Sequence, residues 1–123
     1  MFIIDYTTRV PIYEQIKSQL LSLISSGALR EGDKLPSIRT LAADTRLNVN
    51  TIKKVFAQLE SDGVIVSVVG SGSFVAEGAY RNPRVMERAS AELLEGLKRA
   101  RSAGLGEDEI LEMVKKLYRE EKP

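Results

Sequence analysis

The stretch that decides the fold runs from Leu35 to Val75: LPSIRTLAADTRLNVNTIKKVFAQLESDGVIVSVVGSGSFV. Its first part predicts a short helix from Ile38 to about Asp44. Ser37 stands directly before this helix, and its hydroxyl can accept a hydrogen bond from an amide of the first turn. The next three residues, Thr45 to Leu47, leave room only for a turn.

A second helix begins directly after Asn48, which is another preferred capping residue, and runs to about Asp62. Its apolar residues recur at helical spacing: Ile52, Val55, Phe56 and Leu59. Its polar and cationic residues lie between them: Asn50, Thr51, Lys53, Lys54 and Gln58. Two helices joined by so short a turn predict a helix-turn-helix.

A β-hairpin is predicted directly after the second helix. Gly63 can end that helix, Val64–Val69 is rich in β-branched residues, Gly70-Ser71-Gly72 forms the turn, and Ser73–Ala76 returns. A hairpin in this place is a wing. Its tip has almost no side chain, so its backbone amides can approach a phosphate closely.

Four motifs in this order resemble the DNA-binding domain of GntR-family transcriptional regulators. They are Pro36-Ser37-x-Arg39-x-Leu41-Ala42, Asn48-x-Asn50-Thr51-Ile52, Leu59-Glu60-x-x-Gly63-x-Ile65 and Gly70-x-Gly72-x-Phe74-Val75. The upstream Pro11–Ile16 segment and the Asn-x-Asn-Thr variant are similar to the YtrA subfamily. The resemblance covers about Val10 to Val75. It implies a bacterial transcription factor, usually a repressor of an operon that often contains transporter genes.

The resemblance also implies which residues contact DNA. Arg39 belongs to the Pro-Ser-x-Arg motif, whose arginine contacts DNA in the family, although a random exposed arginine is more often only solvated. We expect residues 48–61 to occupy the major groove as the recognition helix, and the wing, residues 64–76, to lie on the adjacent groove or backbone. The expected DNA-binding residues are Ser37, Arg39, Arg46, Asn48, Val49, Asn50, Thr51, Lys53, Lys54, Gly70, Ser71 and Gly72.

Three of these positions leave alternatives open. Asn48 serves mainly as a helix cap and can also touch a phosphate. Val49 can meet a thymine methyl group or simply be exposed. Arg46 stands where the family commonly has glycine. If the backbone there is left-handed, arginine costs about 1 kcal/mol, unless the turn differs or the cost is accepted for a contact with DNA.

The remainder of the chain is predicted to be helical. A helix from Ile12 to about Ser26 completes a three-helix core, so residues 1–77 form the winged helix-turn-helix domain. In the tail, residues 78–123, Asn82 is predicted to cap a helix from Pro83 to about Ala103, and a last helix is predicted from Glu107 to about Glu121. Their apolar stripes either fold back on the winged domain or pair with a second copy. We favour a homodimer through Met86, Leu93, Leu97, Ile110, Val114 and Leu117.

Composition sets limits on function. The 123 residues include 18 basic and 17 acidic side chains, so DNA affinity must come from local placement of charge. Cysteine and histidine are absent, which excludes disulfides and removes the commonest metal ligand and general base. We therefore expect no catalytic residue, no metal and no cofactor. No apolar run approaches the ~20 residues of a membrane span.

The expected architecture is mainly α with a small β-hairpin, in which the winged domain is followed by a two-helix dimerisation appendage. The expected partners are double-stranded DNA with a palindromic operator and a second copy of the chain, in the cytoplasm, without contact to a membrane. A small-molecule effector is left open. A winged-helix module that binds proteins instead of DNA is the alternative, and the small net charge is its only support.

Overall fold

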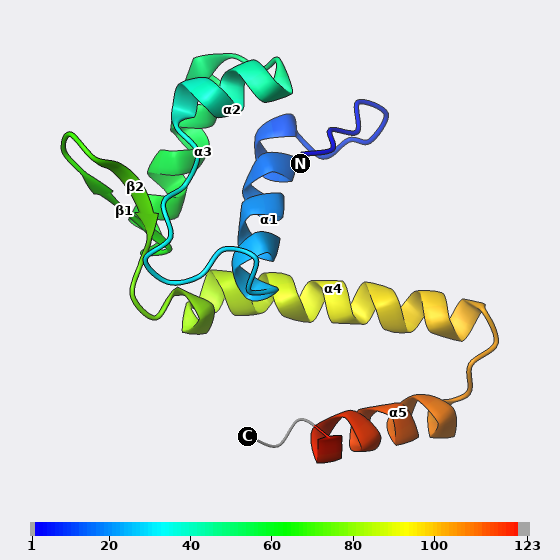
Figure 1. Cartoon of the computed structure of the whole chain (residues 1–123). Helices are drawn as coiled ribbons and strands as arrows, with labels where there is room; N and C mark the ends of the chain where they lie inside the picture. Colours follow the sequence, from blue (N-terminus) through cyan, green and yellow to red (C-terminus); the bar gives the residue numbers. More distant parts are fainter. Residues whose placement is uncertain (1, 121–123) are drawn as a thin grey trace. The chain divides into compact units, whose positions relative to one another are not determined.

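The computed structural model describes residues 2–120 and contains a short antiparallel sheet among helices (Figure 1). The elements are α1 (Ile12–Ser25), α2 (Ile38–Thr45), α3 (Val49–Ser61), β1 (Ile65–Val68), β2 (Gly72–Val75), the 3₁₀-helix η1 (Ala79–Arg81), α4 (Pro83–Ser102) and α5 (Glu107–Glu120). This order confirms the predicted mainly helical fold with one hairpin. The chain divides into two compact units between Ala89 and Ser90.

The core of the first unit lies between α1, α2, α3 and the base of the hairpin. Helix α3 packs against both α1 and α2, and it also contacts β1. The predicted apolar face of α3 is buried throughout, and Ile16 and Leu20 of α1 meet it in the same cluster. Burying one such side chain contributes about 1.5–3 kcal/mol. All buried residues in the described part of the chain are apolar, so the unit is held by hydrophobic packing.

The predicted helix caps are confirmed. The Ser37 hydroxyl accepts a hydrogen bond from the Thr40 amide at 3.0 Å, and Asn48 Oδ1 accepts one from the Asn50 amide at 2.7 Å. Asn82 Oδ1 accepts one from the Arg84 amide at 2.9 Å at the start of α4. Helix α2 continues one residue beyond the predicted end, through Thr45.

The wing differs from its prediction in its turn. Strand β1 pairs with β2 from Ile65–Val75 to Val68–Gly72, so Gly72 belongs to the strand. The turn runs from Val68 to Ser71, whose amide donates to the Val68 carbonyl at 2.9 Å. Gly70 takes the third position with φ of +80°, where a positive φ favours glycine. The sequence placed Gly72 in the turn, but the strand pairing extends to it and leaves Val69–Ser71 as the loop.

A third extended segment, for which the sequence analysis predicts no strand, pairs with the other edge of β2. The Leu35 amide donates to the Ser73 carbonyl at 2.8 Å, and the Val75 amide donates to the Asp33 carbonyl at 2.9 Å. Lys34 therefore lies opposite Phe74 in a β-bridge. This pairing fixes the base of the wing to the chain that enters α2.

The N-terminal residues form an arm without regular structure, held by two glutamines of α1. Gln19 exchanges hydrogen bonds with the Ile3 backbone at 3.0 and 2.6 Å. One turn earlier on the helix, Gln15 bonds the amide and carbonyl of Asp5 at 2.8 and 2.9 Å. The side-chain amides of the two glutamines thus satisfy backbone groups of the arm as a neighbouring strand would.

The tail helices begin as predicted at Pro83 and Glu107. Val85 is buried in the core of the first unit, so the first turns of α4 belong to that unit. The division between compact units falls at 89/90. The predicted domain boundary at 77/78 stays a prediction. The predicted last residue of α5, Glu121, lies outside the described residues.

In the second unit, α5 has no buried residue along its length. Its apolar side chains and those of α4 line an open groove of about 750 Å³. Leu93 is 63% exposed and Leu117 is 52% exposed, so the unit does not cover its own apolar surface. Across residues 2–120, no helix is both long enough and apolar enough to cross a membrane.

Candidate nucleic-acid interface

The first turns of α3 form the centre of the interface. Asn48 and Asn50 are exposed, Val49 is 38% exposed, and Thr51 is half-buried. The side-chain oxygen of Asn48 caps the helix, so the side-chain NH₂ group of the same residue remains available beside the helix end. The N-terminus of a helix also favours negative charge, since its amides point outward. This end of α3 can therefore accept a phosphate and present amide groups to base edges.

The two lysines of α3 have different surroundings. The Lys54 ammonium lies 4.9 Å from the centre of the Tyr13 ring on α1, which is a cation–π contact. The neighbouring Glu14, chiefly through hydrogen bonding, raises the pKa of Tyr13, so at neutral pH the ring is an uncharged phenol. Lys53 is exposed on the next position. Of the two lysines predicted to bind DNA, Lys54 is thus partly engaged within the protein.

Helix α2 supplies Ser37 and Arg39 at its first turn, where both are exposed. Its other end is Arg46, whose φ of +58° and ψ of +31° are left-handed. Arg46 is the one non-glycine residue with a positive φ among residues 2–120. The Leu47 amide closes the end of α2 by donating to the Ala42 carbonyl at 3.0 Å. The open question from the sequence is therefore answered: the turn keeps the geometry that suits glycine.

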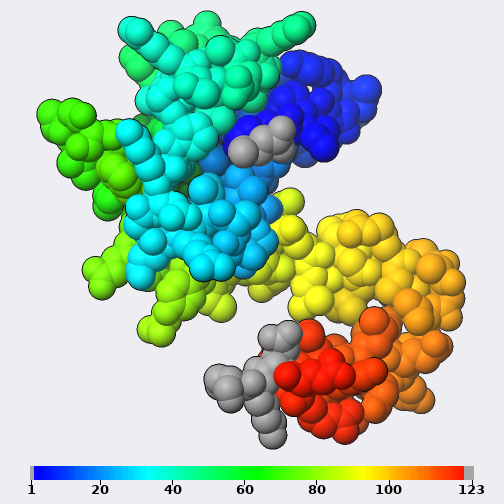
Figure 2. All heavy atoms as spheres, viewed as in Figure 1, coloured from blue at the N-terminus to red at the C-terminus, as the bar shows by residue number. Residues whose placement is uncertain are grey.

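The wing projects from the rest of its unit, as Figure 2 shows for the green residues near 70. Its tip is apolar, since Val69 is fully exposed and residues 64–76 contain no lysine or arginine. Gly70, Ser71 and Gly72 are all exposed, as the prediction requires. Without a cation of its own, the wing cannot neutralise a phosphate.

Lys34 is a cation that lies beside the wing, and the sequence analysis did not include it among the candidate residues. Its Cε lies 3.0 Å from the position that a Cβ on Gly72 would occupy, and the residue itself is exposed. The only signal in the sequence was a lysine just before the Pro36-Ser37 motif. Its neighbours on the wing are about 40 residues away along the chain, so local patterns could not reveal the contact.

The predicted sites are distributed over both units. All twelve residues predicted to bind DNA lie on α2 and its N-cap, on α3, in the turn between these helices or in the wing, which pack together in the first unit (Figure 1). Of the residues predicted for dimerisation, Met86 belongs to the first unit, and Leu93, Leu97, Ile110, Val114 and Leu117 belong to the second. Among residues 2–120, acidic side chains do not gather into a group that could hold a metal ion.

Comparison with known proteins identifies this arrangement. The profile of the family "Bacterial regulatory proteins, gntR family" matches residues 12–75, from the start of α1 to the end of β2. The chain belongs to the GntR family. The resemblance predicted from the four motifs is thereby confirmed, and every predicted DNA-binding residue lies inside the matched range.

Two Bacillus subtilis relatives match nearly the whole chain. The uncharacterized helix-turn-helix regulator YhcF is 37% identical over 90% of this chain and 93% of its own length. The transcriptional repressor YtrA is 35% identical over 95% of this chain and 92% of its own length. The similarity therefore includes the tail and agrees with the predicted likeness to YtrA.

Solved structures agree with both the fold and the DNA-binding role. A GntR-family transcriptional regulator from Listeria monocytogenes superposes with a TM-score of 0.66 at 31% identity, covering 92% of this chain and 98% of that one. The DNA-binding domain of AraR, solved in complex with an operator, has a TM-score of 0.56 at 29% identity, covering 61% of this chain and 96% of that domain. The protein is a helix-turn-helix transcriptional regulator of a family that binds DNA, and its relatives are regulators, not enzymes.

Proposed function

We propose that this protein is a sequence-specific, dimeric repressor that binds a palindromic operator in the cytoplasm and controls an operon. The observation that carries the proposal is the exposed, polar first turn of α3, capped by Asn48 and flanked by the wing. In this proposal α3 lies in the major groove and the wing lies on the adjacent backbone or groove.

Sequence recognition is assigned to short side chains at the start of α3. Asn50 is exposed, and a side-chain amide can make two hydrogen bonds with adenine in the major groove. The exposed Val49 offers an apolar contact for a thymine methyl group. Each well-placed base contact is worth about 1–3 kcal/mol of discrimination. Arg39, from the adjacent helix, is assigned to a base or phosphate at the edge of the same groove.

Affinity is assigned to a few cations placed around this turn. Lys53, Arg46 and Lys34 stand on α3, at the end of α2 and beside the wing, respectively. Each cation that neutralises a phosphate releases condensed counterions, so binding should weaken steeply with salt. This accounts for DNA affinity in a chain whose net charge is only +1.

The dimer is assigned to the tail. An open apolar groove of this size, with leucines more than half exposed along it, is a surface that a second copy can cover. A closed pair with two-fold symmetry is the commonest such arrangement, and it calls for an operator of matching symmetry. Repression is supported by the relative YtrA, which is named a transcriptional repressor.

Selection from random duplex DNA tests the proposal. We expect the full chain to enrich a two-fold symmetric sequence, and its affinity to fall linearly with salt on a logarithmic plot. Asn50→Ala should relax the preference at one position of each half-site, whereas Gln58→Ala, on a later turn of the same helix, should not. Failure to enrich any sequence, together with affinity that does not depend on salt, would favour the protein-binding alternative.

A further inference from the structure

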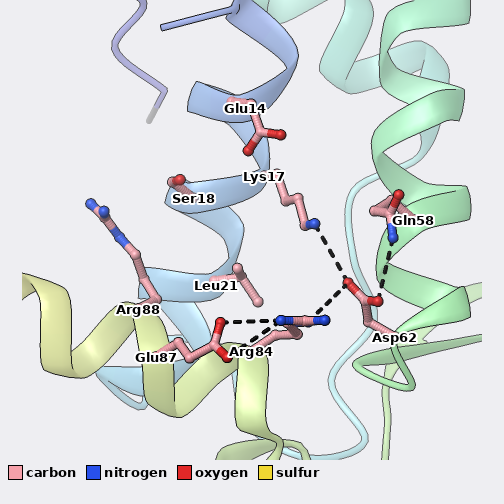
Figure 3. Close-up of a pocket in the computed structure, with 9 residues that line it drawn as sticks. All are labelled: Glu14, Lys17, Ser18, Leu21, Gln58, Asp62, Arg84, Glu87 and Arg88. Carbon is pink, nitrogen blue, oxygen red and sulfur yellow. Dashed lines mark hydrogen bonds and ion pairs between the residues drawn. The ribbon is translucent and has the colours of Figure 1, made fainter.

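A cluster of charged side chains surrounds Asp62, which directly follows the recognition helix (Figure 3). The Lys17 ammonium of α1 lies 3.5 Å from Asp62 Oδ2, and Nε of Arg84, on α4, lies 4.0 Å from the same oxygen. Gln58 donates a hydrogen bond to Asp62 Oδ1 at 3.3 Å. One carboxylate thus joins α1, the end of α3 and the beginning of α4.

The main chain of Asp62 makes a second link to α4. Its carbonyl accepts a hydrogen bond from the side-chain amide of Asn82 at 2.9 Å, and Asn82 also caps α4. Side chain and backbone of the same residue therefore attach the end of the recognition helix to the start of the helix that leads to the tail.

The first turns of α4 are also fixed on the side of α1. Val85 is buried in the core, and Arg88 Nε donates a hydrogen bond to the Ser22 hydroxyl at 3.1 Å. Arg84 is held by Glu87, one turn further along the same helix, at 3.3 Å. Residues 83–88 are consequently joined to α1 and to the end of the recognition helix, and all of these residues belong to the first compact unit.

Burial makes this cluster a costly way to gain stability. The side chains of Asp62 and Lys17 are only 14% and 16% exposed, so both ions lose much of their hydration. Replacing a buried ion pair by apolar residues is often neutral or stabilising, whereas an ion pair demands a particular geometry. The cluster is therefore suited to fixing a direction, because cations from two elements must converge on one carboxylate.

We propose that Asp62 is a positioning residue that fixes α4 against the recognition helix and so sets the half-site spacing that the dimer accepts. The inference rests on the proposed function, in which the tails join two copies. Helix α4 is one helix from Pro83 to Ser102, so the turns that Asp62 holds lead directly into the residues that the proposed function assigns to the dimer.

A series of duplexes in which the two half-sites are separated by successive single base pairs tests this role. The parent should prefer one spacing by about tenfold or more over its neighbours, since twisting or bending DNA to another spacing costs on the order of 1–6 kcal/mol. Asp62→Asn and Arg84→Gln should flatten this preference to a few-fold and leave affinity for a single half-site and the dimer mass unchanged. Glu87→Gln removes a carboxylate that faces Arg84 but not α3, and it should keep the parent's preference.

Three results would overturn the inference. If the Asp62→Asn and Arg84→Gln proteins keep the parent's spacing preference, the cluster does not set the half-site spacing. A loss of single-half-site binding together with a lower melting temperature in both variants would reduce Asp62 to a structural role. A parent that binds no symmetric operator would overturn the proposed function itself, and this inference with it.

Discussion

At the scale of the residue, Arg46 is the position where local geometry and side chain conflict. Its left-handed backbone suits glycine, and a side chain with a Cβ costs about 1–2 kcal/mol there. The arginine is exposed at the turn between the two helices of the motif. The strain is therefore compensated elsewhere in the protein or kept for a contact that glycine cannot make.

Arg46→Gly separates these two explanations. Because glycine adopts a positive φ without strain, we expect the free energy of unfolding to rise by about 1 kcal/mol and the melting temperature to rise by a few degrees. If Arg46 contacts a phosphate, affinity for DNA should fall at the same time, with a lower salt slope. Thermal melting and a salt titration measure the two effects. Unchanged DNA affinity would remove Arg46 from the interface.

The lysines near the interface should differ in their contribution. Lys53→Gln and Lys34→Gln should each weaken binding to all sequences about equally and lower the salt slope by about one, because each is assigned to a phosphate. Lys54→Gln should have a smaller effect on DNA, since its ammonium already lies over the Tyr13 ring. Lys98→Gln, in the tail, is the matched control and should leave the slope unchanged. Equal slopes for the parent and the Lys34 and Lys53 variants would contradict the assignment.

At the scale of the element, the wing is a hairpin whose geometry depends on Gly72. Its φ of +114° lies in a region that side chains rarely adopt, and a Cβ would stand 3.0 Å from Lys34 Cε. The strand therefore passes close to Lys34 because Gly72 has no side chain. The two properties of the wing, its shape and its cation, depend on the same position.

Gly72→Val should consequently impair both wing geometry and DNA binding. The strained φ should lower stability by about 1 kcal/mol or more, and the displaced Lys34 should reduce the salt slope. Ser67→Val is the matched control, since it adds the same side chain at an exposed position of the facing strand, without a positive φ and outside the predicted DNA-binding residues. Amide exchange in residues 64–76 and binding to the operator report the result. A Gly72→Val protein that matches the parent in both would refute this view of the tip.

The elements themselves were largely predictable because their signals are local. Ser37, Asn48 and Asn82 are capping residues directly before their helices, and the apolar spacing of α3 names its buried face. What sequence reasoning missed depends on partners far along the chain. The Asp33–Leu35 segment is extended only because β2 bonds it, and the short η1 helix shows no pattern of its own.

The residues of the candidate site could be named from the sequence, but their contacts could not. Its residues follow from motifs within α2, α3 and the wing, but the surroundings of each side chain do not. Nothing in the local sequence distinguishes Lys53 from Lys54, because Tyr13 lies on a different helix. In the same way, Asp62 has the sequence context of an ordinary helix end, and only packing brings Lys17 and Arg84 to it.

At the scale of the whole molecule, the main unexplained feature is the apolar groove that the tail helices leave exposed. Its helices have leucines, valine and methionine exposed along the groove, and relatives of similar length share this part of the chain. A surface of this kind in a small protein invites association. Two recognition helices joined through it would also contact two half-sites, about one helical turn or ~34–36 Å apart.

Leu93→Glu therefore tests the assembly and its consequence together. A charge placed in the apolar groove should dissociate the dimer, because the buried carboxylate would lack a partner in the interface. We expect light scattering at micromolar concentration to change from dimer to monomer mass, and operator affinity to fall to that of a single half-site. Ala91→Glu places the same charge on the opposite face of α4 and should leave both quantities unchanged. A parent that is already monomeric and binds one half-site tightly would contradict the dimer, and so would a Leu93→Glu protein that keeps the dimer mass.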